Sequence, residues 1–439
     1  MRTRSRVRVH VVTMGCAKNV VDSERLMAQL QLSNVELAPT VDRADVALIN
    51  TCGFIQSAKE ESLEAILELV RLKSRGRLKK VFAMGCLTER YIEDLRKEIP
   101  EVDRFFGSRQ MEDVLQALGA EYRAELLGER LLTTPSHTAY LKISEGCDHP
   151  CSFCAIPLMR GKHRSQPEEA LLDEARRLAE RGVKELVVIG QDTTLYGVDL
   201  DGTRRLGGLL ARLADLPGIE WVRLMYAYPA KFPLDVLEVI AHHPNICKYI
   251  DIPLQHVSDG ILMSMRRGMS CRALREMVAT IRRSVPGVAL RTTLIVGYPG
   301  EGEREFEELF AFVRESRFER LGVFPYSHEE GTTAYPLGDP VPPGEKERRK
   351  ERLMELQREI SEEQNELLIG KTLRVLIDRT ERDHYVGRTE HDAPEIDNEV
   401  FIRSASPLTA GTFCDVDIVE AYEYDIVGVN RREAEGRRR

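Results

Sequence analysis

The sequence predicts an α/β protein in three parts: an N-terminal parallel α/β domain, a central partial barrel of six βα units, and a small C-terminal β-barrel. Three observations predict this class. Short β-branched runs alternate with helical patterns over residues 7–97, the same alternation restarts near Ala139 for six units, and five short strand patterns follow Lys371. Alternation of this kind is typical of parallel sheets, whereas closely spaced strands are typical of small barrels.

Length and composition exclude several other classes of protein. The chain has 439 residues, of which 31% are charged, and its mean hydropathy is −0.30. It contains no run of about 18 apolar residues, so we expect no transmembrane helix. The basic start has too short an apolar stretch for a secretory signal. We therefore expect a cytoplasmic protein, in which nine cysteines act as ligands or nucleophiles rather than disulfides.

In the N-terminal part, each of three apolar runs is followed by a helical pattern, which favours a parallel sheet with crossover helices. Tyr122–His137 has weak periodicity and is interpreted as a connector. The predicted strands are Val7–Met14, Val46–Asn50 and Val81–Met84, and the predicted helices are Asp22–Leu30, Lys59–Lys73 and Glu89–Lys97.

The central part contains six strand patterns with helical patterns between them. Six units are too few for the eight of a closed barrel, so we expect an open one. Its chemistry should lie at the carboxyl ends of the strands. The predicted strands are Tyr140–Ile143, Glu185–Ile189, Trp221–Tyr226, Tyr249–Ile252, Leu290–Val296 and Leu321–Tyr326.

The last part begins after the Pro- and Gly-rich segment Pro336–Pro343. Glu345–Leu368 is predicted to be a highly charged helix with no long apolar face. Five short strands then predict a small barrel of OB-like type. These strands are Leu373–Ile377, Tyr385–Arg388, Val400–Ile402, Asp415–Val419 and Asp425–Val429.

The sharpest local motif is a C-x3-C-x2-C run, Cys147, Cys151 and Cys154, directly after the first strand of the central part. Three thiolates on one loop can hold three irons of a [4Fe–4S] cluster. The fourth iron can then bind the amine and carboxylate of S-adenosylmethionine, which places that cofactor for reductive cleavage.

Two other interpretations of this motif were weighed. Cys147, His149, Cys151 and Cys154 could form a zinc site, although structural zinc sites usually divide their ligands into two separated pairs. An ordinary ferredoxin fits less well, because its cysteine run includes a fourth cysteine. The six βα units behind the motif favour the radical interpretation.

Another set of three cysteines comprises Cys16, Cys52 and Cys86, each just past a predicted strand and before a helix. Because neighbouring parallel strands lie about 4.8 Å apart, these cysteines can converge at one edge of the sheet. Positions ahead of helix N-termini also favour thiolates. We therefore expect a second three-cysteine cluster. The remaining cysteines, Cys247, Cys271 and Cys414, are interpreted as structural thiols.

Several other residues are candidates for the lining of the site. Phe153 could shield the cluster or contact the adenine, or it could be core. Gly190, Gln191, Asp192 and Thr193 end the second central strand, where polar groups could contact the methionine amine or the ribose, although an ordinary turn would look the same. A basic loop past the cluster could pair with a carboxylate of cofactor or substrate. Its residues are Arg160, Lys162, His163 and Arg164.

The chain resembles a methylthiotransferase of the radical S-adenosylmethionine superfamily over nearly all its length. The order of the three parts is the family's. The stretches SEGCDHPCSFCAIPLMRGKHRSQP, VIGQDTTLYG and IDIPLQHVSD resemble most the members that modify a ribosomal protein. The resemblance implies an N-terminal methylthiotransferase domain over residues 1–121, a linker over 122–136, a radical core with its trailing helix over 137–368, and a TRAM domain over 369–435.

The resemblance also implies cofactors and a substrate. Cys147, Cys151 and Cys154 would bind the radical [4Fe–4S] cluster, and Cys16, Cys52 and Cys86 an auxiliary one. Two S-adenosylmethionine-dependent steps, with sulfur delivered through the auxiliary cluster, would methylthiolate the β-carbon of an aspartate in small-subunit ribosomal protein S-twelve. A reductant such as flavodoxin or ferredoxin would supply electrons.

Charge bears on whether the substrate is protein or tRNA. Residues 370–430 contain six Lys and Arg against thirteen Asp and Glu, a net charge of −7. Such a barrel should repel a nucleic-acid backbone and attract a basic protein, above all through the acidic run Glu390–Glu399. Direct nucleic-acid binding is therefore not expected to dominate. The alternatives are a tRNA methylthiotransferase and a non-catalytic RNA-binding or scaffold protein with structural zinc.

Overall fold

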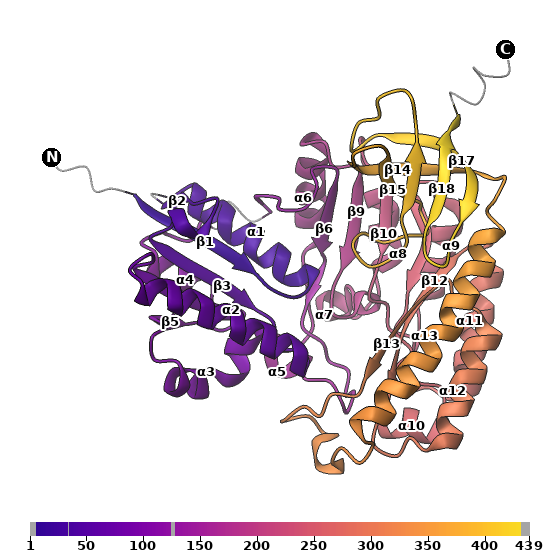
Figure 1. Ribbon diagram of the computed structural model, residues 1–439, viewed down its shortest axis with the longest axis horizontal. Helices are drawn as coiled ribbons and strands as arrows, with labels where there is room; N and C mark the ends of the chain where they lie inside the picture. The colour runs from indigo at the N-terminus through magenta and orange to yellow at the C-terminus, as the bar shows by residue number, and fades with distance from the viewer. Residues whose placement is uncertain (1–5, 34, 124–127, 432–439) are drawn as a thin grey trace.

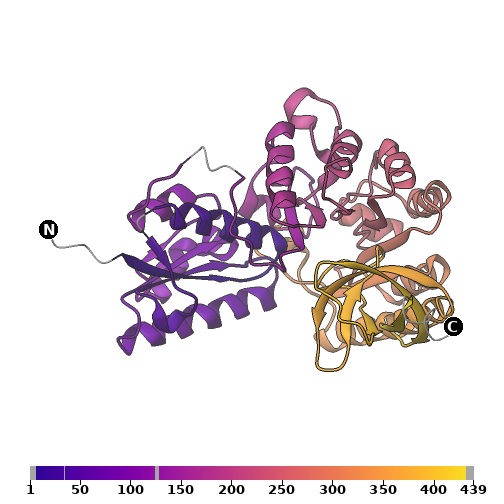
Figure 2. The same ribbon diagram turned by 90° about the horizontal axis from the view of Figure 1, so that it is seen from above.

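The computed structural model describes residues 6–33, 35–123 and 128–431. Residues 1–5, residues 124–127 of the predicted linker and residues 432–435 of the predicted third domain therefore lie outside the described residues. The chain forms an N-terminal α/β lobe beside a larger lobe, in which the C-terminal barrel covers one end of the central sheet (Figures 1 and 2). Among the described helices, none combines the length and hydropathy needed to cross a membrane.

The N-terminal lobe contains a five-stranded parallel sheet in the order β2-β1-β3-β4-β5. Every residue of β3 is buried, which explains why this strand is an uninterrupted apolar run rather than an alternating one. The three predicted strands are confirmed; the edge strands β2 and β5 were not predicted because they have only three and two residues. The elements are β1 Val7–Thr13, α1 Ala17–Gln31, β2 Val35–Leu37, β3 Val46–Thr51, α2 Gln56–Ser74, β4 Lys80–Gly85, α3 Cys86–Glu98, β5 Arg104–Phe105 and α4 Met111–Ala117.

The central lobe is an open six-stranded parallel sheet in the order β13-β12-β11-β10-β9-β6, which confirms the predicted partial barrel. Its strands are β6 Thr138–Lys142, β9 Glu185–Ile189, β10 Trp221–Leu224, β11 Ile246–Asp251, β12 Ala289–Val296 and β13 Arg320–Pro325. A two-stranded ribbon, β7 Ser144–Glu145 with β8 Arg164–Ser165, follows β6. The helices are α5 Ile156–Arg160, α6 Glu168–Glu180, α7 Val198–Asp201, α8 Leu206–Ala214, α9 Leu234–His242, α10 Asp259–Ser264, α11 Cys271–Ser284, α12 Glu303–Ser316 and α13 Pro343–Glu366.

The trailing helix α13 departs from expectation. Leu353, Leu356 and Ile360 are buried, and they join the main hydrophobic core of the central lobe. The prediction of a helix without a long apolar face was therefore wrong over its second half. Charged residues at the neighbouring positions mask this i, i+3, i+7 stripe in the sequence.

The C-terminal part is a closed barrel of five strands in the order β14-β15-β16-β18-β17, which confirms the predicted small barrel. Small inward-facing aliphatic side chains, among them Val375, Ile402 and Ile418, fill its interior. The strands are β14 Thr372–Thr380, β15 Tyr385–Arg388, β16 Val400–Arg403, β17 Phe413–Ala421 and β18 Ile426–Asn430.

Most of the acidic run Glu390–Glu399 contacts the rest of the protein instead of forming a free acidic surface, as the sequence led us to expect, and Glu395 alone of its acidic residues is exposed. Asp397 accepts a hydrogen bond from the Tyr249 hydroxyl over 2.6 Å, and Asp392 accepts one from Arg320 Nε over 3.0 Å. Leu376 and Ala393 belong to the same buried cluster as Tyr249. Asp392 and Asp397 therefore help to dock the C-terminal barrel onto the central sheet, where they pair with Arg320 and Arg291.

A buried ion network strengthens the same interface. Glu185, the first residue of β9, is fully buried between Arg223 Nε and Arg388, each 2.7 Å from one of its carboxylate oxygens. Burial alone would raise the pKa of Glu185, but the charges of Arg388 and Arg223 outweigh it and lower that pKa. Arg388 thus extends from the barrel to the central lobe, where its positive charge pairs with Glu185.

Candidate active site

The first cysteine set lies at one edge of the N-terminal sheet. Cys16 precedes α1, Cys52 directly follows β3, and Cys86 directly follows β4. Because β1, β3 and β4 are adjacent parallel strands, the three cysteines leave the sheet at the same edge. The fold thus brings the three cysteines to one edge of the sheet, as their spacing of about one βα unit predicted.

Glycines allow these three loops to approach one another. Gly15 has φ +84°, and a Cβ there would lie 2.6 Å from the Cys52 Cβ and 2.9 Å from its sulfur. A Cβ on Gly53 would lie 2.7 Å from the backbone nitrogen of Leu87. Real side chains do not fit at such distances, so only glycine permits loops this close.

The second set lies on the loop after β6, which the β7–β8 ribbon folds back on itself. The Cys147 N–H donates to the Gly161 carbonyl over 3.0 Å, and the Cys154 N–H to the Cys151 carbonyl over 3.2 Å. Burial raises the pKa of both Cys147 and Cys154 to about 12. Thiols in such surroundings become thiolates only when positive charge joins them, as iron ions would supply. The donor set therefore fits a cluster with three cysteine ligands.

Arg267 is a charged partner of this loop that the sequence did not reveal. Its guanidinium donates to the Cys151 sulfur over 3.3 Å and lies 4.4 Å from the centre of the Tyr228 ring. The ring of His149 also stacks on Tyr228, with the ring centres 3.5 Å apart. Arg267 is thus placed to stabilise negative charge on Cys151.

His149 contacts Asp192 and Tyr228 instead of the cysteine sulfurs. Its Nε2 lies 2.6 Å from an Asp192 carboxylate oxygen, and its ring is stacked on Tyr228. Within the described residues, no group of three or more His, Cys, Asp or Glu side chains, the two cysteine sets included, is gathered closely enough to hold one metal ion. The zinc interpretation with Cys147 is disfavoured by the contact with Asp192, which engages the His149 ring away from the cysteine sulfurs.

The predicted polar turn after β9 has mixed surroundings. Asp192 accepts from Thr194 N–H over 2.8 Å, and Thr193 Oγ1 donates to the Met225 carbonyl over 3.0 Å, so both side chains hold the fold. Gln191 donates to Glu145, but its buried Oε1 has no partner. A Cβ on Gly190 would lie 2.6 Å from the Ser144 hydroxyl, so this turn lies against the loop that bears the cysteines.

Phe153, on the cysteine loop, has apolar surroundings. It packs against an apolar cluster that contains Met265, Tyr298 and Tyr326. Ser152, next to it, donates to the Ser264 carbonyl over 2.8 Å. Phe153 therefore anchors the cysteine loop to the ends of β12 and β13, whatever else it contacts.

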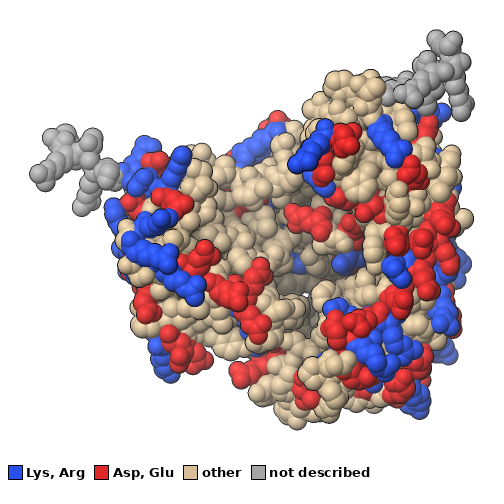
Figure 3. Space-filling view, in the orientation of Figure 1, with Lys and Arg blue, Asp and Glu red and all other residues tan. Residues whose placement is uncertain are grey.

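The two cysteine sets meet at the interface between the lobes. Cys86 forms a buried cluster with Ala155 and Met159, the first of which directly follows Cys154. Arg160 Nε, from α5, donates to the Cys86 sulfur over 3.2 Å. Burial raises the pKa of Cys86 to about 12 although Arg160 opposes this. Figure 3 shows the surface hollowed between the two lobes.

Arg160 also joins a buried set of charges beneath the cysteines. It lies 2.6 Å from Asp22 of α1, which also pairs with Lys142, while Lys142 lies 2.7 Å from Glu145. The cations Lys142 and Arg160 lower the pKa of Asp22 against the opposing effect of burial. The basic loop predicted from sequence thus contains one residue, Arg160, that pairs with carboxylates inside the protein.

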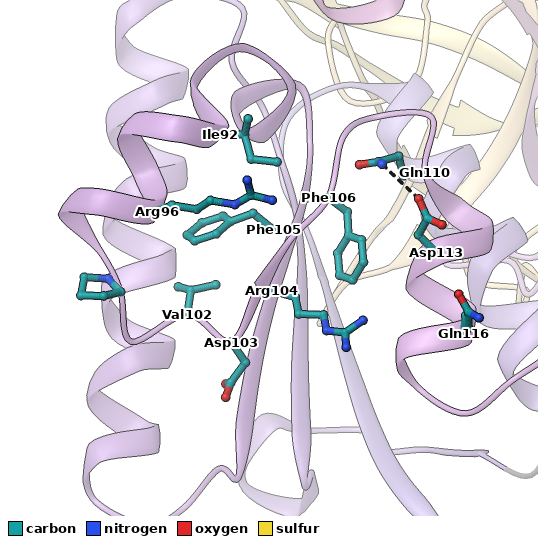
Figure 4. Close-up of a pocket in the computed structure, with 11 residues that line it drawn as sticks. Ile92, Arg96, Val102, Asp103, Arg104, Phe105, Phe106, Gln110, Asp113 and Gln116 are labelled. Atoms are coloured by element: carbon teal, nitrogen blue, oxygen red, sulfur yellow. Dashed lines mark hydrogen bonds between the residues drawn. The ribbon is translucent and has the colours of Figure 1, made fainter.

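A separate pocket of about 620 Å³ lies in the N-terminal lobe between α3, β5 and α4 (Figure 4). Ile92, Phe105 and Gln110 are among its eleven lining residues, and Gln110 donates to Asp113 over 3.0 Å. None of the six cysteines lines this pocket. It is therefore distinct from the candidate active site.

Three stretches of the chain match known families. Residues 8–107 match the uncharacterized protein family UPF0004, residues 141–313 the radical SAM superfamily, and residues 369–430 the TRAM domain. Together with the cysteine loop after β6, these matches define a radical SAM methylthiotransferase.

Proteins named ribosomal protein uS12 methylthiotransferase RimO are similar over nearly the whole chain. The protein from Chloroherpeton thalassium is 54% identical over 427 residues, 96% of this chain and 98% of its own length. The one from Flavobacterium johnsoniae is 54% identical over 434 residues, 98% and 99% of the two lengths. The chain therefore belongs to the RimO family, which confirms the resemblance predicted from sequence.

Solved structures show the same fold at low sequence identity. The radical S-adenosylmethionine methyltransferase TsrM from Kitasatospora setae, with cobalamin and a [4Fe–4S] cluster bound, has a TM-score of 0.54 at 12% identity and covers 75% of this chain and 77% of its own. The cobalamin-dependent enzyme OxsB has a TM-score of 0.53 at 13% identity, covering 80% and 56%. At these identities the likeness concerns the fold alone.

Proposed function

We propose that this radical SAM methylthiotransferase methylthiolates the β-carbon of an aspartate residue of ribosomal protein uS12, in the cytoplasm. The names of relatives at 54% identity support the substrate. The observation that carries the proposal is the meeting of two three-cysteine sets at one interface, through Cys86 and Arg160. One substrate can then reach both sets without leaving the site.

The radical SAM family implies one [4Fe–4S] cluster and S-adenosylmethionine. We propose that Cys147, Cys151 and Cys154 hold that cluster, and that Cys16, Cys52 and Cys86 hold a second. When bound, these groups supply reductive cleavage, hydrogen abstraction and sulfur transfer, with electrons from a reductant such as flavodoxin or ferredoxin.

The chain's own residues position and protect these groups. At the cysteine edge of the N-terminal sheet, Cys52 and Cys86 are buried and shielded from water, whereas Cys16 is exposed. Arg160 and Arg267 each donate a hydrogen bond to one cysteine sulfur, which stabilises negative charge on these ligands. The unpartnered Gln191 Oε1 is a hydrogen-bond acceptor for a donor such as the methionine amine.

Mass spectrometry of a deletion strain tests the proposed substrate. We expect uS12 to lose one methylthio group while bulk tRNA keeps its modifications. Unchanged uS12 with lost tRNA modification would instead support a tRNA methylthiotransferase of MiaB type. Anaerobic purification tests the cofactors: two clusters require about eight iron ions per chain, whereas a colourless zinc protein would support a scaffold.

A further inference from the structure

Buried cations in this chain are almost always paired with carboxylates. Nine Lys and Arg residues of the described chain are at most 7% exposed. Only two of them, Lys18 and Arg267, form no ion pair with a carboxylate among the described residues, and Arg267 has the Cys151 sulfur as its partner. The other seven are Arg130, Lys142, Arg160, Arg223, Lys346, Arg349 and Arg388.

Lys18 lies where the two lobes meet. It is the second residue of α1, two positions after Cys16, and its Nζ lies 2.9 Å from the centre of the Tyr226 ring. Tyr226 follows β10 at its carboxyl end, and its carbonyl accepts the Thr193 N–H over 3.1 Å. Lys18 therefore spans from the first cysteine set to the end of the central sheet that bears the second.

Tyr226 is held rigidly in this place. Its φ is +59°, an unusual backbone conformation for a tyrosine, and its N–H donates to an Asp251 carboxylate oxygen over 3.0 Å. Strained residues persist where the surrounding structure fixes them, and they cluster at binding sites. The ring is thus a fixed platform on which the Lys18 ammonium rests.

The contact with Tyr226 leaves the charge of Lys18 only partly compensated. Removing an ammonium from water costs more free energy than one aromatic face returns. The N-terminus of α1 beside it adds further positive potential. An anion that enters the interface would relieve both, and a small carboxylate fits the single ammonium.

We propose that Lys18 binds the side-chain carboxylate of the substrate aspartate and so determines specificity for that residue. This inference rests on the proposed function. The reacting β-carbon is bonded directly to the carboxylate carbon, so a residue that holds the carboxylate at the interface also holds the β-carbon between Cys16 and the Cys147 loop. The carboxylate of S-adenosylmethionine has the same chemistry, and the experiment must separate the two sources.

The test uses the full chain with its iron reconstituted and S-adenosylmethionine present, with fluorescently labelled uS12 as the probe. The probe is used in two forms, natural and with its modified aspartate replaced by asparagine. Lys18→Met removes the charge at similar length, and Lys18→Arg keeps it. Dissociation constants for both forms are measured by anisotropy, the dissociation constant for S-adenosylmethionine by equilibrium dialysis, and iron by assay.

We expect the wild-type chain to bind the aspartate form about tenfold more tightly than the asparagine form, as a charge-assisted hydrogen bond would give. Lys18→Met should bind both forms with the weaker constant, and Lys18→Arg should recover part of the preference. Iron content and affinity for S-adenosylmethionine should stay within about twofold of the wild-type values.

Three results would overturn this inference. The first is a wild-type chain that binds the aspartate and asparagine forms of uS12 equally well, a result that does not depend on the folding of any variant. The others are a Lys18→Met chain that still prefers the aspartate form, or one that loses affinity for S-adenosylmethionine instead of uS12. The proposed function is tested separately, before the binding measurements. Its failure would appear as an absence of methylthiolated uS12 with the wild-type chain under turnover.

Discussion

Arg160 Nε donates a hydrogen bond to the Cys86 sulfur over 3.2 Å, although the two residues belong to different lobes. Cys86 directly follows β4 of the N-terminal sheet, and Arg160 ends α5, six residues after Cys154. A single side chain therefore couples the two cysteine sets. Asp22 compensates the charge of Arg160, and this ion pair holds the guanidinium in place.

We expect Arg160→Met to lower the reduction potential of the second cluster, which we propose is held by Cys16, Cys52 and Cys86. A positive hydrogen-bond donor stabilises the more negative, reduced state, and removing it disfavours reduction. A redox titration followed by electron paramagnetic resonance measures this change. Arg164→Met is the matched control, because Arg164 is exposed on the same loop and should leave the potential unchanged. Equal potentials in the Arg160 variant and the wild type would contradict the prediction.

Substitutions should distinguish the roles of the two cysteine sets. We expect Cys147→Ala to abolish cleavage of S-adenosylmethionine, because the radical cluster proposed at Cys147, Cys151 and Cys154 loses a ligand. Cys16→Ala should spare cleavage but lose sulfur insertion. Deoxyadenosine and methylthio product are measured by chromatography and mass spectrometry. Cys247→Ala, in β11, is the control and should retain both activities. Full product yield from Cys16→Ala would refute the role given to the N-terminal lobe.

The sequence predicted those features that depend on local pattern. The six central strands, the three long N-terminal strands and the five-stranded barrel all follow from hydrophobic periodicity. The convergence of Cys16, Cys52 and Cys86 at one sheet edge follows from parallel topology, because each cysteine lies between the end of a strand and the helix that comes after it.

Contacts between distant segments could not be predicted in this way. The pairing of Asp392 with Arg320 joins residues 72 apart, and no local signal links them. The acidic run was therefore interpreted as a surface, although Asp392 and Asp397 are paired with arginines inside the protein. Lys18 was missed for the same reason. Its position after Cys16 is visible in the sequence, but only the three-dimensional structure shows that no carboxylate among the described residues pairs with it.

Glu185 should dominate the docking of the C-terminal barrel. We expect Glu185→Gln to lower the free energy of unfolding by about 3–5 kcal/mol, because Arg223 and Arg388 stay buried with less compensation. Urea unfolding measures the change. Glu220→Gln is the control, since its pair with Arg374 crosses the same interface but is about 40% exposed, and it should cost at most about 1 kcal/mol. Equal losses in the two variants would show that burial does not set the strength of the interface.

The same carboxylate should make stability depend on pH. The pKa of Glu185 is lowered in the folded chain, because Arg388 and Arg223 outweigh the effect of burial. Its contribution is thus fully present above the unfolded value of about 4.3 and is lost as pH falls through the lower folded pKa. We expect the difference in urea midpoint between wild type and Glu185→Gln to shrink between about pH 6 and pH 3. A difference that grows towards acid would contradict the sign of this shift.

Gly15 should be required for the first cysteine set to form. Gly15→Ala places a Cβ 2.6 Å from the Cys52 Cβ at φ +84°, so the two loops must separate. We expect iron to fall to about four ions per chain, as one cluster is lost and the other stays.

Gly76→Ala isolates the backbone contribution to this effect. Gly76 has a similar φ of +72°, but nothing lies within 4 Å of a Cβ there. This variant should cost only about 1 kcal/mol of left-handed backbone strain and keep its iron. Iron assay and thermal unfolding of both variants distinguish the two causes. If both keep full iron, the loops can part without loss of the cluster; if both lose it, backbone strain rather than contact with Cys52 controls assembly of the site.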